Sequence, residues 1–476
     1  MTEQSSLARR RFLQLVSGIG VSALAGCSLF DGPDSTDPTA TPRPAPSGPA
    51  DATATLRAAS RTVQLSQKES TENWLYNGAF PGPEIRVAEG NVFEATVTNE
   101  LPEGTTIHWH GIPVANAMDG VPNVTQQPVD PGRSFTYTFR AEPPGTYFFH
   151  SHVGLQLDRG LLAPLIIEES DPHVEYDREY TVVVDDFLDR APQPLSSGGS
   201  GGGPMGGGGP GGRGGMMGGR RPPYAGLLIN GHLPADPQRF DVQEGERIRF
   251  RFINASSATL FRVQLGGHPM TITHADGRPV EPVTANSFSF GSGERYDAIV
   301  EATNPGTWEM RATAVDGNEP PAKAIIAYDG STSATPTAPS KSGSQLSYDD
   351  LVAVSPLDGI DGNPDRTFDL TLSAGGQSGE WLIDGQAYPD ADSLHIREGE
   401  HVRVSMTNRS PVIHPMHLHG HFFQVKNAVK DTVVVPGHMG QVTFDFVADN
   451  PGSWLFHCHN LYHLEAGMAR VVQYVK

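Results

Sequence analysis

The sequence contains very little cysteine, since its 476 residues include only Cys27 and Cys458. A framework of internal disulfide bonds is therefore excluded, and Cys458 must find its partners among other residue types. Basic side chains are also scarce, with 34 Lys and Arg against 54 Asp and Glu and a formal net charge of -20. This charge repels phosphate groups and argues against nucleic acid as a partner.

Long apolar runs are lacking as well, apart from one short run near the N-terminus. It follows the letters RRRFL at residues 9–13 and is too short for a comfortable transmembrane helix, so we interpret residues 1–30 as a twin-arginine export signal. The run ends in LAGC, which resembles a lipobox and predicts a lipid anchor on Cys27; a plain signal peptide is the alternative. Residues 31–55 read as a disordered tether. We expect an exported protein at the outer face of the cytoplasmic membrane or in a periplasm-like space.

Convincing amphipathic helices are scarce, and one strand pattern occurs three times instead. The segments are GRSFTYTFRAEPPGTYFFHSH from Gly132, GERYDAIVEATNPGTWEMRA from Gly293 and GQVTFDFVADNPGSWLFHCH from Gly440. Each consists of an alternating strand, a Pro-Gly turn and an aromatic-rich strand, and the segments upstream repeat too. The repeats predict duplicated all-β domains of Greek-key sandwich or barrel type. We place these domains at about 56–170, 171–335 and 345–476.

The three copies differ at their ends, which read HSH, MRA and HCH in chain order. The middle copy has therefore lost any metal-binding capacity at this position, and the chemistry belongs to the first and third copies. A Gly/Met-rich insertion at residues 196–221 interrupts the middle copy. Its methionines suit soft Cu(I), although a disordered loop with incidental methionines is the alternative interpretation.

Histidine is the residue that the sequence arranges most clearly, because ten of the eighteen histidines fall into four clusters. Residues i and i+2 of a strand share a face, so each His-x-His presents two imidazoles side by side. One such pair is a weak signal, but four pairs from two domains can converge on one pocket. The clusters are His108 and His110; His150 and His152; His414, His417 and His419; and His457, His459 and His463.

Cys458 lies between two histidines, so its side chain points to one face of a strand while both imidazoles point to the other. One strand can then serve two metal sites. Two imidazoles, a thiolate and a weak axial methionine are the ligands of a blue-copper electron-transfer centre. Zinc is the competing metal, but a structural zinc site gives no reason for the methionine. The ligands available on this face are Cys458, His414, His463 and Met468.

The opposite face collects eight imidazoles and no carboxylate from the motifs. This set suits several copper ions that deliver electrons together, which is an oxygen-reducing arrangement.

Taken in order from residue 108 to residue 468, the four motifs resemble those of the three-domain multicopper oxidases, the laccase-like and copper-resistance enzymes. The resemblance covers essentially everything after residue 56 and implies an all-β fold of three cupredoxin-like Greek-key β-sandwich domains. It also implies four copper ions, one of type 1, one of type 2 and two of type 3. Carried over by position, the type 1 ligands are Cys458, His414, His463 and axial Met468, the type 2 ligands are His108 and His417, and the type 3 ligands are His110, His150 and His459 for one copper and His152, His419 and His457 for the other.

The resemblance further implies a mechanism, in which substrate gives single electrons to the type 1 copper and four electrons reduce O₂ to two waters. Asp119, in AMDGVP, matches an acidic residue that assists proton delivery near the type 2 copper. A turn-forming Asp-Gly is the other interpretation of this residue. Many bacterial relatives place a glutamate directly after the last type 1 histidine, whereas this chain has Leu464 there and Glu465 next. On a strand or turn that shift would redirect the side chain.

The predicted function is a multicopper oxidase of phenols and aromatic amines, as in laccases. Oxidation of Cu(I) or another metal ion in copper tolerance is the alternative enzyme function, favoured by the Gly/Met insertion. Ser410 argues against it, because some cuprous oxidases have a substrate-binding aspartate at that position. Copper storage and a role as an envelope scaffold are the alternatives outside the enzyme class. The expected partners are O₂ and a small-molecule or metal-ion electron donor.

Overall fold

The computed structural model describes residues 39–64, 70–194, 221–331, 335–376 and 379–476. The expected export signal, Cys27 and residues 196–220 of the insertion lie outside these residues. The expected all-β fold is confirmed, because one five-residue helix, α1 (Leu461–Glu465), and three short 3₁₀ turns are the helical elements found in the described residues. None of these helices is long and apolar enough to span a membrane.

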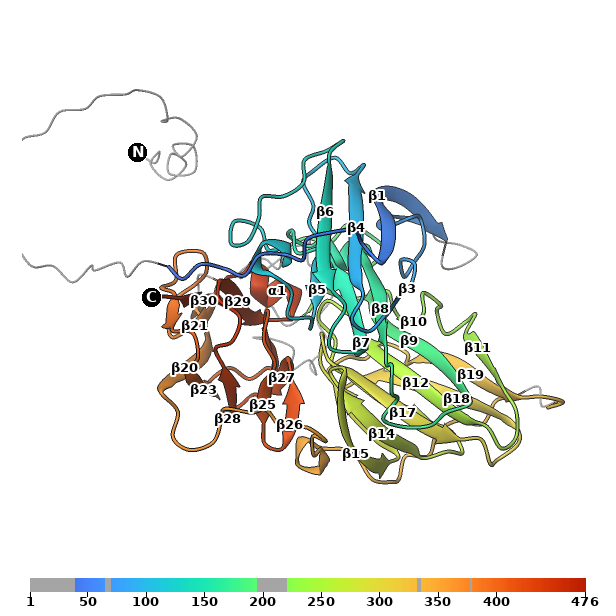
Figure 1. The fold of residues 1–476 in the computed structure, drawn as a ribbon. Coiled ribbons are helices and arrows are strands. Elements are labelled where there is room, and N and C mark those ends of the chain that lie inside the picture. Colours follow the sequence, from blue (N-terminus) through green and yellow to red (C-terminus); the bar gives the residue numbers. More distant parts are fainter. Residues whose placement is uncertain (1–38, 65–69, 195–220, 332–334, 377–378) are drawn as a thin grey trace, which may run out of the picture. The chain divides into compact units, whose positions relative to one another are not determined.

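The first β-sandwich pairs two four-stranded sheets, ordered β2-β1-β4-β6 and β3-β8-β7-β5 (Figure 1). Two 3₁₀ turns, η2 (Asn116–Met118) and η3 (Leu157–Arg159), lie in its loops. Its strands are β1 (Ala52–Gln64), β2 (Ser70–Tyr76), β3 (Ile85–Ala88), β4 (Val92–Asn99), β5 (His108–His110), β6 (Ser134–Arg140), β7 (Gly145–His150) and β8 (Leu162–Glu168).

The second sandwich pairs a six-stranded sheet, β10-β9-β12-β17-β14-β15, with a five-stranded sheet, β11-β19-β18-β13-β16. Its strands are β9 (Arg178–Phe187), β10 (Gly226–Ile229), β11 (Gln238–Val242), β12 (Arg247–Asn254), β13 (Phe261–Leu265), β14 (Met270–Ala275), β15 (Arg278–Ala285), β16 (Ser287–Phe290), β17 (Arg295–Glu301), β18 (Thr307–Ala314) and β19 (Ala322–Tyr328).

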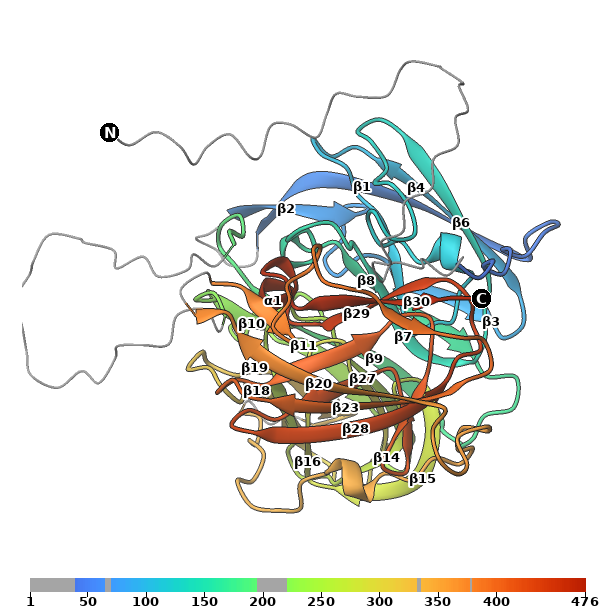
Figure 2. The same cartoon turned by 90° about the vertical axis from the view of Figure 1, so that its left-hand side faces the viewer.

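The third sandwich also pairs six strands, β21-β20-β23-β28-β25-β26, with five, β22-β30-β29-β24-β27 (Figure 2). The turn η4 (Tyr348–Asp350) precedes it. Its strands are β20 (Arg366–Ala374), β21 (Trp381–Ile383), β22 (Leu394–Ile396), β23 (His401–Asn408), β24 (His414–Leu418), β25 (Phe423–Val425), β26 (Ala428–Lys430), β27 (Thr432–Val435), β28 (Gly440–Val447), β29 (Ser453–Cys458) and β30 (Ala469–Tyr474).

The sequence repeats correspond to repeated strand pairings. The opening strand of each sandwich runs parallel to a central strand, as β1 with β4, β9 with β12, and β20 with β23. That central strand then pairs antiparallel with the next repeated strand, as β4 with β6, β12 with β17, and β23 with β28. In β4 and β23 every second side chain is fully buried, which is the alternation expected where one face of a sheet covers a core.

Two histidines outside the four clusters occupy equivalent places in the second and third sandwiches. His268 Nε2 lies 2.6 Å from the hydroxyl oxygen of Tyr328, and His421 Nε2 lies 2.6 Å from that of Tyr474. In each pair the imidazole and phenol rings are stacked, at interplanar angles of 17° and 13°. Both pairs are buried and satisfy their polar atoms within the core, so we interpret them as structural residues.

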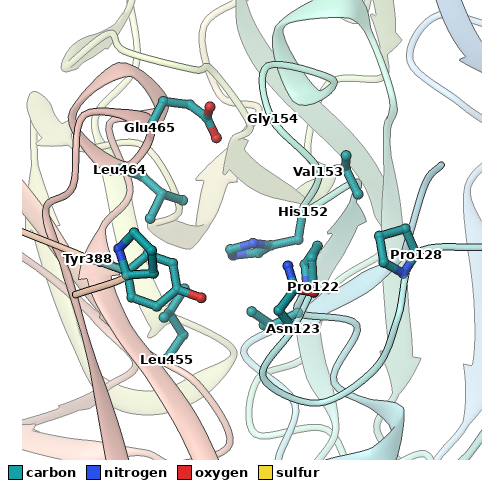
Figure 3. Close-up of a pocket in the computed structure, with 12 residues that line it drawn as sticks. Pro122, Asn123, Pro128, His152, Val153, Gly154, Tyr388, Leu455, Leu464 and Glu465 are labelled. Atoms are coloured by element: carbon teal, nitrogen blue, oxygen red, sulfur yellow. The ribbon is translucent and has the colours of Figure 1, made fainter. Parts of the chain in front are cut away.

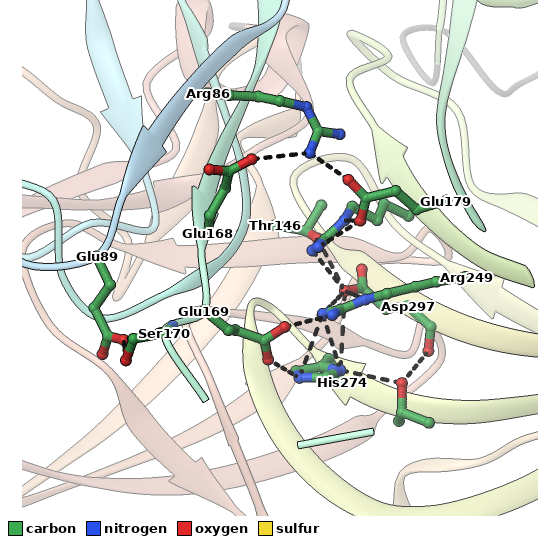
Figure 4. A network of polar contacts seen from close by, with 12 residues as sticks. Arg86, Glu89, Thr146, Glu168, Glu169, Ser170, Glu179, Arg249, His274 and Asp297 are labelled. Atoms are coloured by element: carbon green, nitrogen blue, oxygen red, sulfur yellow. Dashed lines mark hydrogen bonds and ion pairs between the residues drawn. The ribbon is translucent and has the colours of Figure 1, made fainter. Parts of the chain in front are cut away.

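A buried polar network joins the first sandwich to the second (Figure 4). Arg249 of β12 donates to Asp297 Oδ2 at 2.6 Å and also contacts Glu169, just beyond β8. His274 Nε2 lies 2.9 Å from Glu169 Oε1, so the carboxylate has two partners. These contacts leave the pKa of Glu169 at about 2, because the attraction of His274 and Arg249 outweighs partial burial. The network therefore couples the two sandwiches through charge.

Candidate metal centre

The four histidine clusters lie on, or one to two residues beyond, two pairs of neighbouring strands, apart from His463 in helix α1. In the first sandwich β5 pairs with β7, which sets His108 opposite His150. In the third sandwich β24 pairs with β29, which sets His417 opposite His457. The two hydrogen-bonded pairs of strands thus present their His-x-His motifs to a common space, as the period of two along a strand requires.

The first group of donor atoms consists of Cys458, His414 and His463. The Nδ1 atoms of the two histidines are 3.1 Å apart, and Cys458 Sγ lies 3.5 Å from each of them. All three side chains are fully buried. One S and two N donors at such separations can surround a single small ion.

Helix α1 brings His463 to this group. Asn460 caps the helix, and its side-chain oxygen accepts hydrogen bonds from the backbone N–H groups of Tyr462 and His463. The chain therefore turns sharply after β29, and His463 returns to the side of the strand that Cys458 faces. Met468 N then donates to His463 O at 2.9 Å, which closes the turn and buries Met468 in the same core cluster as Cys458.

Two side chains surround the group from outside. Ser410 Oγ lies 2.9 Å from His414 Nε2, so the nitrogen of His414 that faces away from Cys458 is held in place. The indole of Trp381 packs on His463 with ring centroids 4.1 Å apart and also touches His414, at 5.1 Å. Trp381 thus separates the donor group from solvent. No motif in the sequence marks this residue.

The other eight histidines form three groups whose donor atoms lie within 4.8 Å of one another. The sequence-predicted type 2 pair belongs to the first group, and the two predicted type 3 sets form the other two. The groups are His108, His110 and His417; His110, His150 and His459; and His152, His419 and His457.

The ring nitrogens show that this space suits metal ions. In these rings one nitrogen typically hydrogen-bonds to a group outside the cluster. His108 Nδ1 lies 2.9 Å from Asp119 O, and His150 Nδ1 lies 2.9 Å from Ser151 O. The opposite nitrogens, His108 Nε2 and His150 Nε2, are buried and have no hydrogen-bond partner among the described residues, and the same holds for His417 Nε2. Buried polar atoms without partners are costly, so a set of them aimed into one space fits bound metal.

Burial also sets the protonation state of the donors. It lowers the pKa of His150, His414 and His457 to about 3 each, so these imidazoles are neutral at pH 7 and able to bind a metal. Burial raises the pKa of the Cys458 thiol, so a metal that binds the thiolate must displace its proton.

Asp119 lies behind the eight-histidine cluster, and it is fully buried. Its Oδ2 lies 3.0 Å from His419 Nδ1, and its Oδ1 lies 3.2 Å from His108 Nδ1. These nitrogens are on the far side of each ring from the Nε2 atoms, so the carboxylate orients two histidines from outside the cluster.

Glu465 and His152 line one cavity of 360 Å³ between the first and third sandwiches (Figure 3). Leu464, Tyr388 and Leu455 form much of the apolar wall. Loss of solvent raises the pKa of Glu465. The cavity therefore connects a carboxyl group with a histidine of the cluster.

A second carboxylate, which no sequence motif predicted, lies near the cluster. Asp431 Oδ1 lies 3.3 Å from His110 Nε2, and Asp431 O lies 2.8 Å from His417 Nδ1. The Thr432 hydroxyl lies 3.1 Å from the same His417 nitrogen. These residues follow β26 at a distance from every histidine motif in the sequence, so no local pattern marks them.

The fold and the site together define a three-sandwich protein with a place for several metal ions. Residues 57–172, 179–331 and 361–476 each match the multicopper oxidase family. The chain therefore belongs to the multicopper oxidases, which are copper-binding oxidoreductases built from cupredoxin domains.

Named relatives agree with this assignment. The chain is 34% identical over 423 residues to the multicopper oxidase MmcO of Mycobacterium tuberculosis, covering 84% of this chain and 82% of the relative. It is 31% identical to laccase-4 of Trametes villosa (83% and 85% covered) and 26% identical to copper resistance protein A of Escherichia coli (83% and 88% covered). The crystal structure of a multi-copper oxidase from Pseudomonas thermotolerans superposes with a TM-score of 0.69 at 26% identity, covering 90% of this chain and all of the other.

Proposed function

We propose that the protein couples four one-electron oxidations of a donor to the reduction of O₂ to two waters. The observation that carries this proposal is that β29 and the residue directly after it contribute to both donor groups. Cys458 belongs to the group with His414 and His463, while its neighbours His457 and His459 belong to the eight-histidine cluster. No third residue has to bridge the two groups.

Four copper ions fit these groups, one of type 1 at the thiolate and one of type 2 with two of type 3 among the eight histidines. Bound copper would supply a one-electron acceptor at the first group and a multi-electron centre for O₂ at the second. The chain orients the rings through the contacts of Asp119 and Ser410, keeps water from the thiolate with Trp381, and offers Glu465 as a group that can move a proton in the cavity beside His152.

Phenols and aromatic amines are the donors that we favour. The support is the likeness to laccases and the role of Ser410, which bonds to His414 and has no carboxylate to bind a substrate metal ion. Oxidation of Cu(I) is the second candidate, favoured by the relatives named copper resistance protein A.

Oxygen uptake by copper-loaded protein without residues 1–38 tests both candidates, because this truncation leaves β1 and its pairing with β4 intact. A phenol and Cu(I) are supplied as separate donors, and hydrogen peroxide is assayed alongside. Uptake without peroxide supports four-electron reduction, and the faster donor identifies the substrate class. Full copper loading without uptake from either donor would refute the enzyme proposal and point to copper storage or an envelope scaffold.

We further propose that the protein is exported and lipid-anchored through Cys27. The support is the order of RRRFL, the short apolar run and LAGC in the first 27 residues. The full chain should partition into the detergent phase of an extract, and Cys27→Ala should move it to the aqueous phase. Equal partitioning of both proteins would contradict the anchor.

A further inference from the structure

The middle sandwich contributes residues to the eight-histidine cluster although its own repeat lacks histidine at the corresponding end. Gly293, two residues before the start of β17, has φ +91° and packs against the cluster. A Cβ at this position would lie 2.9 Å from His110 Cε1 and 3.1 Å from His459 Cδ2. Any side chain here would displace those rings, so the backbone of the second sandwich forms part of the wall of the cluster.

Arg295, two residues further on, forms a bidentate ion pair with Asp431 of the third sandwich, which we call the fork. Its Nη1 donates to Asp431 Oδ1 at 2.7 Å, and its Nη2 donates to Asp431 Oδ2 at 2.6 Å. Both side chains are completely buried. Two parallel bonds between a planar guanidinium and a carboxylate fix the direction of the carboxylate as well as its position.

Asp431 in turn holds two histidines through different atoms. Its backbone carbonyl oxygen lies 2.8 Å from His417 Nδ1, and its Oδ1 lies 3.3 Å from His110 Nε2. The Thr432 hydroxyl donates to Asp431 Oδ1 at 2.8 Å and also lies 3.2 Å from His110 Nε2. The two imidazoles are stacked, with centroids 3.9 Å apart. A movement of Asp431 would therefore move both rings.

Arg295 itself is held from all three sandwiches. Its Nε donates to Thr146 O of β7 at 3.2 Å, and its Nη1 also donates to Gly293 O at 2.9 Å. A Cβ on Gly111, next to His110, would lie 2.4 Å from Arg295 Nη2, so only glycine leaves room for the guanidinium there. The fork cannot shift without moving backbone of the first or second sandwich.

We propose that Arg295 is a positioning residue, through which the middle sandwich sets the orientation of His417 and thereby the geometry of the type 2 copper. His110, which belongs to one of the type 3 sets, is held through the same carboxylate. The inference rests on the proposed function, because it concerns one of the proposed copper ions. A buried ion pair alone is weak evidence for a stabilising role. Loss of an outer hydrogen-bonding partner of a metal ligand typically weakens metal binding by roughly 10- to 100-fold.

The test uses the full chain loaded with copper. Arg295→Met removes the fork, and Arg295→Lys keeps a buried positive charge but cannot make two parallel bonds. Arg249→Met is the matched control, because Arg249 is also completely buried and bonded to an aspartate in the same sheet, away from the cluster. The measurements are copper per chain after dialysis against a chelator, the type 2 electron paramagnetic resonance spectrum, and the blue absorption band of the type 1 copper.

We expect both Arg295 variants to show an altered type 2 spectrum and roughly 10- to 100-fold weaker retention of that copper. Their blue band should be unchanged, and Arg249→Met should resemble the wild type in both respects. Wild-type behaviour of Arg295→Lys would overturn the inference, as would parallel loss of both copper types in Arg295→Met and Arg249→Met. A wild-type protein without a type 2 signal would refute the proposed copper assignment itself, and with it the inference.

Discussion

Replacement of Asp119 by asparagine tests how the chain orients the eight-histidine cluster. The carboxylate is fully buried and faces two ring nitrogens, His419 Nδ1 at 3.0 Å and His108 Nδ1 at 3.2 Å. Both nitrogens must carry hydrogen for their Nε2 atoms to be free to bind metal. Asp119→Asn keeps the volume of the side chain but turns one acceptor into an N–H donor.

The magnitude follows from these contacts. The asparagine oxygen can keep the bond to His419, and its NH₂ group then faces a second donor on His108. His108 retains the backbone carbonyl of Asp119 at 2.9 Å, so one acceptor is lost and not two. A buried N–H donor that is left without an acceptor costs about 1–3 kcal/mol. We therefore expect copper affinity to fall by roughly 5- to 150-fold. Asp119→Ala, which loses both side-chain oxygens and leaves a cavity, should be worse.

The assay is oxygen uptake as a function of pH, together with the type 2 resonance spectrum and copper content. If Asp119 also moves protons, the uptake of fully loaded Asp119→Asn should fall most at high pH, where protons from solvent are scarce. If Asp119 only orients the rings, uptake should fall by the same factor at every pH. Asp130→Asn, an exposed aspartate in the same sandwich, is the control. Wild-type spectrum, copper content and uptake in Asp119→Asn would refute the reasoning.

Three further predictions concern other parts of the molecule. Trp381→Ala should uncover His463 and speed phenol oxidation relative to Cu(I) oxidation. Urea unfolding of this variant should show a loss of about 3 kcal/mol in the free energy of unfolding. Equal rate changes for both donors would contradict the covering role. Glu465→Gln should abolish one of the pH-dependent changes in the rate of oxygen uptake, because the titrating carboxyl group is removed. An unchanged pH profile would exclude this group from the proton path. Glu169 has a pKa lowered from 4.5 to about 2, so its ionised form stabilises the fold above pH 4.5 and this contribution is lost as the pH falls towards 2. Urea unfolding of Glu169→Gln should therefore show a loss of about 3 kcal/mol at pH 7 that vanishes near pH 2, and a constant difference would contradict the pairing with Arg249.

The sequence was sufficient to predict the all-β fold and the two faces of the strand that carries Cys458, because both depend on local periodicity, whereas the expected sets of histidines came from the family resemblance. Alternation along β29 separates Cys458 from its two histidine neighbours whatever the rest of the chain does. The Pro-Gly turns and the repeats identify the duplicated strands in the same way. These features are readable from a few consecutive residues.

The residues that hold the rings from outside could not be predicted in this way. Asp431 lies 136 positions from Arg295 in the chain, and the two meet because different sandwiches pack together. Trp381 covers His463 from a separate strand, β21, 82 positions earlier in the chain. Neither residue belongs to a motif, and contacts between domains leave no periodic trace in a single sequence.

The position of Glu465 shows how the type of secondary structure changes such an inference. On a strand, the shift from Leu464 to Glu465 would turn the carboxylate to the opposite face. These residues instead belong to helix α1, where successive side chains differ by about 100°. Leu464 and Glu465 therefore both line the cavity beside His152. A one-residue displacement of the carboxylate is compatible with proton transfer here because the capping by Asn460 makes this segment helical.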